Sequence, residues 1–96
     1  MSKYILLLNW TEQGAKSVKE SANRYDAAKE AAKKVGATLE AIYLTFGQYD
    51  LVAVLDAPSD EAVATFNLRL SSAGNIRGVT LKAFPEADYR KIIAGI

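Results

Sequence analysis

The chain has 96 residues, of which 50% are hydrophobic and 24% are charged, and its 12 basic and 11 acidic residues leave a formal charge of +1. This composition is typical of one globular domain spanning residues 1–96, with no separate cofactor lobe and no basic field for nucleic acid. Cysteine and histidine are both absent, which excludes disulfides, thiol chemistry, zinc fingers and histidine-based acid–base catalysis. We therefore expect no cofactor and no metal site.

The apolar run Tyr4–Leu8, followed by a polar break, predicts a first strand over Lys3–Trp10. Both faces of this strand are apolar, because Ile5 and Leu7 alternate with Tyr4, Leu6, Leu8 and Trp10. The run is too short for the hydrophobic core of a secretory signal or for a membrane helix. We therefore expect a cytoplasmic protein with no membrane partner.

A helix is predicted over Thr11–Val35, with Thr11 as its cap and Gly36 at its end. Ser17 and Glu20 have the spacing of a capping box, and Asn23 is a second candidate cap that would divide the segment into two helices. Basic and acidic residues alternate here, which predicts a solvated helix face; the basic ones are Lys16, Lys19, Arg24, Lys29, Lys33 and Lys34.

The rest of the chain is predicted as β-β-α-β followed by a short amphipathic helix. Gly47-Gln48 forms a tight hairpin, Ser59 caps the helix, and Gly74 ends it. The expected segments are strands Thr38–Phe46 and Asp50–Asp56, the helix from Ser59, a strand over Asn75–Phe84 and a terminal helix over Glu86–Ile96. The resulting order β-α-β-β-α-β predicts an α+β, ferredoxin-like fold.

Two helices in this topology cover one face of the sheet and leave the other face bare. Whichever way the register runs, that bare face is apolar here, because strands one and three have no polar side. A patch of this kind predicts self-association, most simply a homodimer in which two sheets face each other across a two-fold axis. The alternative is that the terminal helix Glu86–Ile96 folds over the bare face of its own chain.

The segment Gly47-Gln48-Tyr49-Asp50-Leu51-Val52 resembles the hairpin signature of the GYD-domain family, which is named for a Gly-x-Tyr-Asp motif. Leu8–Gly14 is similar to the family's first-strand exit, and Gly74–Arg77 with Ala83–Pro85 is similar to its last strand. The resemblance covers nearly the whole chain. It implies a dimeric α/β barrel and implies no particular activity.

Two more distant resemblances concern the kind of function. The hairpin, together with Gly78-Val79, is similar to the ligand-sensing domain of Lrp/AsnC regulators, which oligomerise and bind amino acids at subunit interfaces; the helix-turn-helix of those regulators is absent here. By fold, the chain also resembles cofactor-free monooxygenases, which place a substrate between sheet and helices. Several of those enzymes use a histidine that this chain lacks.

Five residues are candidates for binding a small molecule: Trp10, Tyr43, Tyr49, Asp50 and Arg77. The aromatic side chains suit an apolar pocket wall, and Asp50 beside Tyr49 suits a ligand amine. Each residue also has a structural interpretation. The aromatic residues would belong to the core or to an interface, and Asp50 would accept backbone N–H groups in its turn. Arg77 would be a charged residue that keeps an edge strand from pairing with another chain.

The sequence thus predicts a homo-oligomeric small-molecule-binding or assembly module whose partner is a second copy of itself. The alternative is a cofactor-free enzyme acting on a small organic substrate, with Tyr43, Tyr49 and Asp50 as the available proton-transfer groups. We favour the binding role and assign no catalytic residue.

Overall fold

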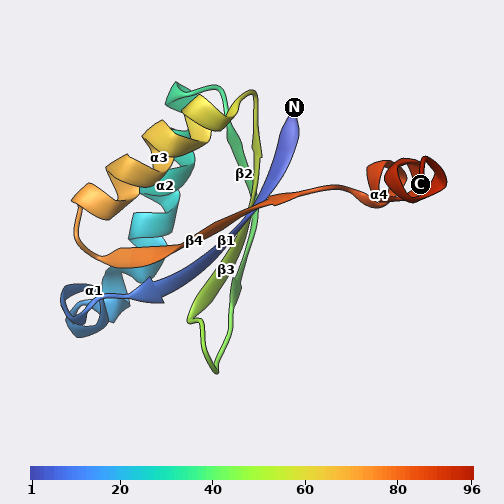
Figure 1. Cartoon of the computed structure of the whole chain (residues 1–96). Coiled ribbons are helices and arrows are strands. Elements are labelled where there is room, and N and C mark those ends of the chain that lie inside the picture. The colour runs from blue at the N-terminus through green and yellow to red at the C-terminus, as the bar shows by residue number, and fades with distance from the viewer.

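A computed structural model describes all 96 residues and places a four-stranded antiparallel sheet against two helices (Figure 1). The predicted α+β, ferredoxin-like order β-α-β-β-α-β with a short terminal helix is confirmed. The elements are β1 (Ser2–Trp10), α1 (Glu12–Lys16), the 3-10 turn η1 (Val18–Glu20), α2 (Ser21–Lys34), β2 (Thr38–Leu44), β3 (Leu51–Ala57), α3 (Asp60–Ser72), β4 (Ile76–Ala83) and α4 (Glu86–Ala94).

The sheet has the strand order β2-β3-β1-β4, so that β1 and β3 lie in its centre. β1 is antiparallel to both of its neighbours, and Leu6 lies opposite Ala53 of β3 and Thr80 of β4. Because successive side chains alternate across a strand, Leu6 is buried beneath the helices while Leu7 faces the other side. The central strands therefore present apolar side chains to both faces.

Helices α2 and α3 cover one face of the sheet, and the core lies between these two layers (Figure 1). Its largest fully buried side chains are those of Phe66, Leu6 and Leu55. Much of the remaining core is alanine, contributed by Ala32, Ala37, Ala53 and Ala57. Alanine brings the helix and sheet backbones close together but fills little volume between them.

The segment between β1 and β2 is divided into α1, η1 and α2. Thr11 caps α1 as predicted, with its hydroxyl accepting from the backbone N–H of Gly14 at 3.1 Å. The predicted capping box is wrong, since Ser17 makes no side-chain cap bond, and Asn23 lies inside α2 and not at its start. Arg24 accounts for the break, because its guanidinium donates to the carbonyl oxygen of Ser17 at 2.9 Å, where the first helix stops.

Ser59 caps α3 as predicted and accepts from the backbone N–H of Ala62 at 3.1 Å. Asp60 follows it in the first turn of the helix, where a negative charge is favoured. β2 ends at Leu44, two residues before the predicted end at Phe46, because the chain already leaves the sheet at Thr45 to form the hairpin loop. These differences do not alter the topology.

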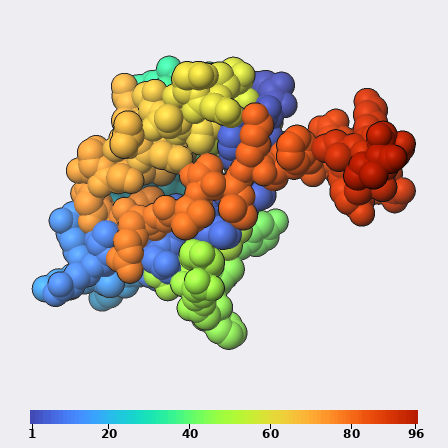
Figure 2. All heavy atoms as spheres, in the orientation of Figure 1, coloured from blue at the N-terminus to red at the C-terminus, as the bar shows by residue number.

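Helix α4 stands apart from the body of the molecule. It lies on the side of the sheet opposite α2 and α3, and it joins β4 through a thin neck (Figures 1 and 2). None of its residues is buried. The alternative in which Glu86–Ile96 covers the bare face of its own sheet is therefore wrong, because the chain leaves β4 without turning back. No helix in the structure has the length and apolar character needed to cross a bilayer.

Candidate functional site

The bare face of the sheet carries a continuous apolar surface, called the open face below. The strand registers align its side chains in two rows, Tyr43-Val52-Leu7-Val79 and Ala41-Val54-Ile5-Leu81. Val79 and Leu81 are 49% and 45% exposed, and Tyr43 is 60% exposed. Rows of large apolar side chains across all four strands, with nothing covering them in their own chain, are typical of an interaction surface.

Charged residues border one end of the open face. The Lys3 ammonium forms ion pairs with the carboxylates of Glu40 and Asp56, the latter at 3.9 Å. The hydrogen bond to Glu40 raises the pKa of Lys3 above its ordinary value. The apolar rows are thus bordered at one end by charged residues, as the apolar centre of a protein interface is bordered by polar ones.

On the other side of the sheet, a cavity of about 260 Å³ lies between the sheet and helices α2 and α3. Its wall is mostly apolar and includes five alanines, Ala27, Ala28, Ala31, Ala53 and Ala73. These methyl groups cannot fill the space between the layers, so the cavity follows directly from the alanine-rich sequence of α2. Its few polar lining residues are Ser21, Arg24, Arg69 and Asn75, and an apolar wall with a small polar set is typical of ligand pockets.

Trp10 contacts both the cavity and the hairpin that follows β2. Its ring lines the cavity, while its backbone N–H donates to the Asp50 carboxylate at 3.0 Å. The indole Nε1 is buried and has no hydrogen-bond partner. A buried donor without an acceptor costs about 1–3 kcal/mol, so the position of Trp10 is maintained by the packing of its ring and by its backbone bond.

The hairpin loop closes through a short set of bonds around Asp50. The Asp50 N–H donates to the carbonyl of Leu8 at 2.9 Å and to the side-chain oxygen of Asn9 at 3.1 Å. Thr45 donates through its hydroxyl to the carbonyl of Tyr49 at 2.6 Å. Asp50 thus fastens the hairpin to the exit of β1, in addition to any role in its own turn.

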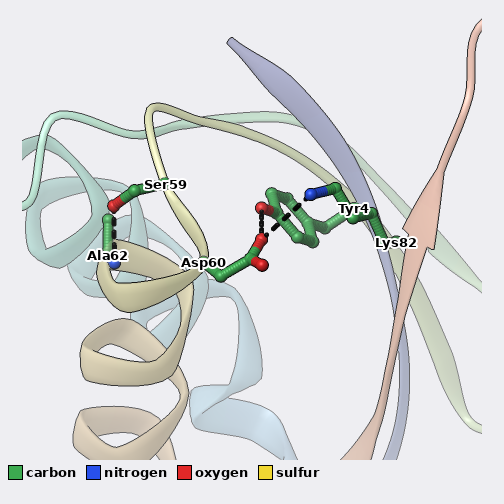
Figure 3. Close-up of polar contacts among 5 residues, drawn as sticks. All are labelled: Tyr4, Ser59, Asp60, Ala62 and Lys82. Atoms are coloured by element: carbon green, nitrogen blue, oxygen red, sulfur yellow. Dashed lines mark hydrogen bonds and ion pairs between the residues drawn. The ribbon is translucent and has the colours of Figure 1, made fainter.

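At the opposite end of β1, Tyr4 and Lys82 converge on Asp60 at the start of α3 (Figure 3). The Tyr4 hydroxyl donates to the Asp60 carboxylate, and the Lys82 ammonium lies 3.3 Å from the same oxygen. The hydrogen bond to Asp60, together with burial, raises the pKa of Tyr4 to about 12, and the two donors lower the pKa of Asp60. This cluster ties α3 to the sheet.

Comparison with known proteins identifies the family. The GYD domain family model matches residues 4–93. The chain belongs to the GYD-domain family. The resemblance carried by Gly47–Val52 is thereby confirmed.

Two relatives extend this result. A Thermus thermophilus protein named "Glutamine synthetase and cystathionine beta-lyase binding protein" is 33% identical to the chain over 89 residues, covering 92% of this chain and 94% of that protein. The crystal structure of TTHA0845 from Thermus thermophilus is similar with a TM-score of 0.55 and 26% identity, over 88% of this chain and 95% of that one.

The GYD signature residues have clear structural roles in this chain. Gly47 has a φ of 109°, which favours glycine, and it lies at the open tip of the hairpin. Gly14, in the first-strand exit, packs so closely on the loop before β4 that a Cβ atom there would lie 2.0 Å from the carbonyl oxygen of Asn75. In the same contact, Thr11 donates through its backbone N–H to that carbonyl at 3.0 Å. Motifs far apart in the sequence thus meet beside the cavity.

The five predicted ligand residues do not gather at one place. Only Trp10 lines the cavity. Tyr43 lies on the open face of β2, and Arg77 lies at the other edge of the sheet on β4, opposite Asn9 of β1. Tyr49 and Asp50 lie in the hairpin, where the Asp50 carboxylate accepts from the backbone N–H of Trp10.

Sequence reasoning missed the residues that form the cavity, above all Arg24 and the alanines of α2. Arg24 was assigned to a solvated helix face, yet it is partly buried and its guanidinium donates to the carbonyls of Ser17 and Gly14. The run of alanines at helical spacing was visible in the sequence, and it predicts a close helix–sheet approach with unfilled volume. No group of acidic side chains has the arrangement of a metal site.

Proposed function

We propose that this GYD-domain protein is a homodimeric binding module in which two copies join through their open faces. The observation that carries this proposal is an excess of exposed surface. A compact monomer of 10.4 kDa exposes about 5,400 Å², whereas this chain exposes 6327 Å². The excess of roughly 900 Å² is close to the 800 Å² or so that each partner contributes to an interface of standard size.

The energetics favour such a pair. Burying about 800 Å² per copy, two-thirds of it apolar, corresponds to roughly 25 kcal/mol of gross hydrophobic stabilisation for the dimer. Loss of translational and rotational freedom costs about 4–15 kcal/mol. Ordering of side chains and desolvation of polar groups at the interface reduce this balance further, and we expect association at micromolar concentrations.

A two-fold axis would place the rows through Leu7 and Ile5 of one copy against the same rows of the other. Two stacked sheets lie about 10 Å apart, with side chains interdigitating between them. A single protomer has one helix layer, α2 and α3, on one face of its sheet and none on the open face. The second copy would supply the missing layer.

The family supports a binding role more than catalysis. One relative is named for binding two metabolic enzymes, and by analogy we propose that the dimer presents its outer surfaces to a protein partner. The enzyme alternative is weakened by the positions of Tyr43, Tyr49 and Asp50, none of which lies in the cavity. The three proton-transfer groups that the sequence offers therefore do not face the cavity.

Sedimentation equilibrium over a range of micromolar concentrations tests the dimer directly. We expect a mass of twice 10.4 kDa at the higher concentrations, with dissociation on dilution. A single species of monomer mass at every concentration would refute the proposal.

The cavity supports a second function, which is the binding of a small, mainly apolar molecule. Its 260 Å³ exceed the roughly 150 Å³ of an apolar cavity that accommodates benzene. Native mass spectrometry of freshly purified protein would detect a discrete added mass. The variant Ala28→Leu fills part of the cavity and should lose that mass, whereas the exposed substitution Ala87→Leu should retain it; equal retention in both variants would place the ligand elsewhere.

A further inference from the structure

Helix α4 is a short helix without tertiary support. It has nine residues, none buried, and it projects from the body as a separate lobe (Figures 1 and 2). Isolated helices shorter than about 12–15 residues are marginal in water, because most helical stability comes from packing of an apolar face. A stable α4 therefore requires a surface that its own body does not provide.

The side chains of α4 define the surface that needs covering. Tyr89, Ile92 and Ile93 of α4 recur at i, i+3 and i+4, which places them on one stripe of the helix, and Ile96 follows just beyond its end. They are between 49% and 96% exposed, and Phe84 in the neck is 59% exposed. The charges beside this stripe are balanced, since Glu86 pairs with Arg90 at 2.7 Å. A neutral, aliphatic and aromatic stripe fits an apolar protein surface better than a highly charged partner.

The neck prevents α4 from returning to its own sheet. Only Phe84 and Pro85 separate β4 from α4. Pro85 is extended, with φ −58° and ψ 162°, and its carbonyl accepts from the Tyr89 N–H at 2.9 Å to begin the helix. This short link continues the line of β4, so the arm projects beyond the sheet and does not fold back on it (Figure 1).

We propose that α4 packs on a second copy of this chain, and that two copies exchange these arms reciprocally across their two-fold axis. The inference rests on the proposed dimer. α4 lies off the open side of the sheet (Figure 1), which is the side on which a facing copy would sit. The arm also begins close to the open face, because Leu81 of that face lies on β4 a few residues before α4.

Three chains compared by sedimentation equilibrium test the exchange. The first ends at Pro85 and lacks residues 86–96, and the second carries Ile92→Asp and Ile93→Asp on the stripe. The matched control is Lys91→Asp, which places the same carboxylate on the opposite side of the helix. We expect the dimer dissociation constant to rise about 100-fold or more in the first two, because each loses its apolar contacts twice per dimer. The control should stay within about fivefold of the unaltered chain.

The truncated chain should keep its fold, since α4 contributes nothing to the buried core; circular dichroism checks this. A wild-type chain that is monomeric throughout would overturn the dimer and the exchange together. A wild-type dimer whose truncated form dissociates at the same concentration would overturn the exchange and leave the dimer standing.

A second measurement does not depend on truncation. The chain contains no cysteine, so Ala87→Cys provides a unique site for a spin label on the polar side of α4. The ¹⁵N-enriched wild-type chain, which carries no spin label, is mixed with the spin-labelled chain. Only the wild-type chain gives ¹⁵N signals, so any broadening of them reports a contact between two molecules. We expect broadening of a contiguous patch on the enriched chain. Uniform spectra in a mixture that sedimentation shows to be dimeric would overturn the exchange.

Discussion

Leu7 is the residue at which the proposed dimer is most directly tested. It occupies the middle of the open face, with Val52 of β3 and Val79 of β4 on either side. The substitution Leu7→Thr keeps a side chain suited to a strand and replaces an apolar group by a hydroxyl. Little of the buried core is disturbed, because Leu7 faces away from the helices.

The size of the effect follows from symmetry. Full burial of a leucine side chain is worth about 1.5–3 kcal/mol, and a two-fold axis makes each substitution count twice. Leu7 is already partly covered by its neighbours in one protomer, so the lower limit of about 3 kcal/mol per dimer applies. This corresponds to a dimer dissociation constant raised about 100-fold.

Sedimentation equilibrium of Leu7→Thr against Leu44→Thr measures this difference. Leu44 is the matched control, because it is a strand leucine that is 75% exposed and pairs with Leu51, a residue of the cavity side. Surface substitutions away from an interface alter free energies by about 0.5 kcal/mol or less per copy, so Leu44→Thr, counted twice, should change the dissociation constant by about fivefold at most. Equal dissociation constants for the two variants would refute the assignment of the open face as the interface.

Three other predictions concern stability, measured by urea or thermal unfolding. Asp50→Ala removes the acceptor of the Trp10 N–H and should lower the free energy of unfolding by about 1–3 kcal/mol, whereas Asp50→Asn retains an oxygen acceptor and should lose less; equal losses would contradict this. Tyr4 has a pKa of about 12 against an ordinary 10.0, so it binds its proton more tightly when folded. The contribution of this proton to the free energy of unfolding is complete below pH 10 and is lost between pH 10 and about 12. Tyr4→Phe should therefore reduce the fall of the free energy of unfolding with pH in that window, and an unchanged pH dependence would count against the hydrogen bond. Gly14→Ala forces a methyl group onto the Asn75 carbonyl and should cost about 1–3 kcal/mol, so an unchanged melting temperature would rule out that close contact.

The topology could be predicted because local patterns and the fold agree in most segments. The apolar run Tyr4–Leu8, the cap at Ser59 and the stop at Gly74 each mark an element that the structure contains. The candidate cap at Asn23 predicts a division of the first helical segment, but the observed break lies earlier, at residues 17–20. It depends on Arg24, whose guanidinium bonds the carbonyls of Ser17 and Gly14, and such a contact between successive turns leaves no periodic pattern.

The side of the sheet on which Tyr43 lies could not be predicted, and the cause lies in β2. The register of β2 against β3 shifts between Leu39 and Ala41, which is a bulge at Glu40. In a regular strand, Leu39 and Tyr43 would share a face, and Tyr43 would reach the cavity beside Trp10. The extra residue reverses this alternation, so Ile42 lines the cavity while Tyr43 faces the open side.

The open face and the cavity are two sides of the same central strands. On β1, Ile5 and Leu7 face outward while Leu6 and Leu8 reach the core and the cavity. A strand is a single backbone, so we expect a displacement of β1 by an occupant of the cavity to alter the open face, where the proposed dimer would form. Thermodynamic linkage is reciprocal. A molecule that lowers the dimer dissociation constant must therefore bind the dimer more tightly than the monomer. Measuring ligand affinity above and below the dimer dissociation constant would therefore show whether the two faces act together.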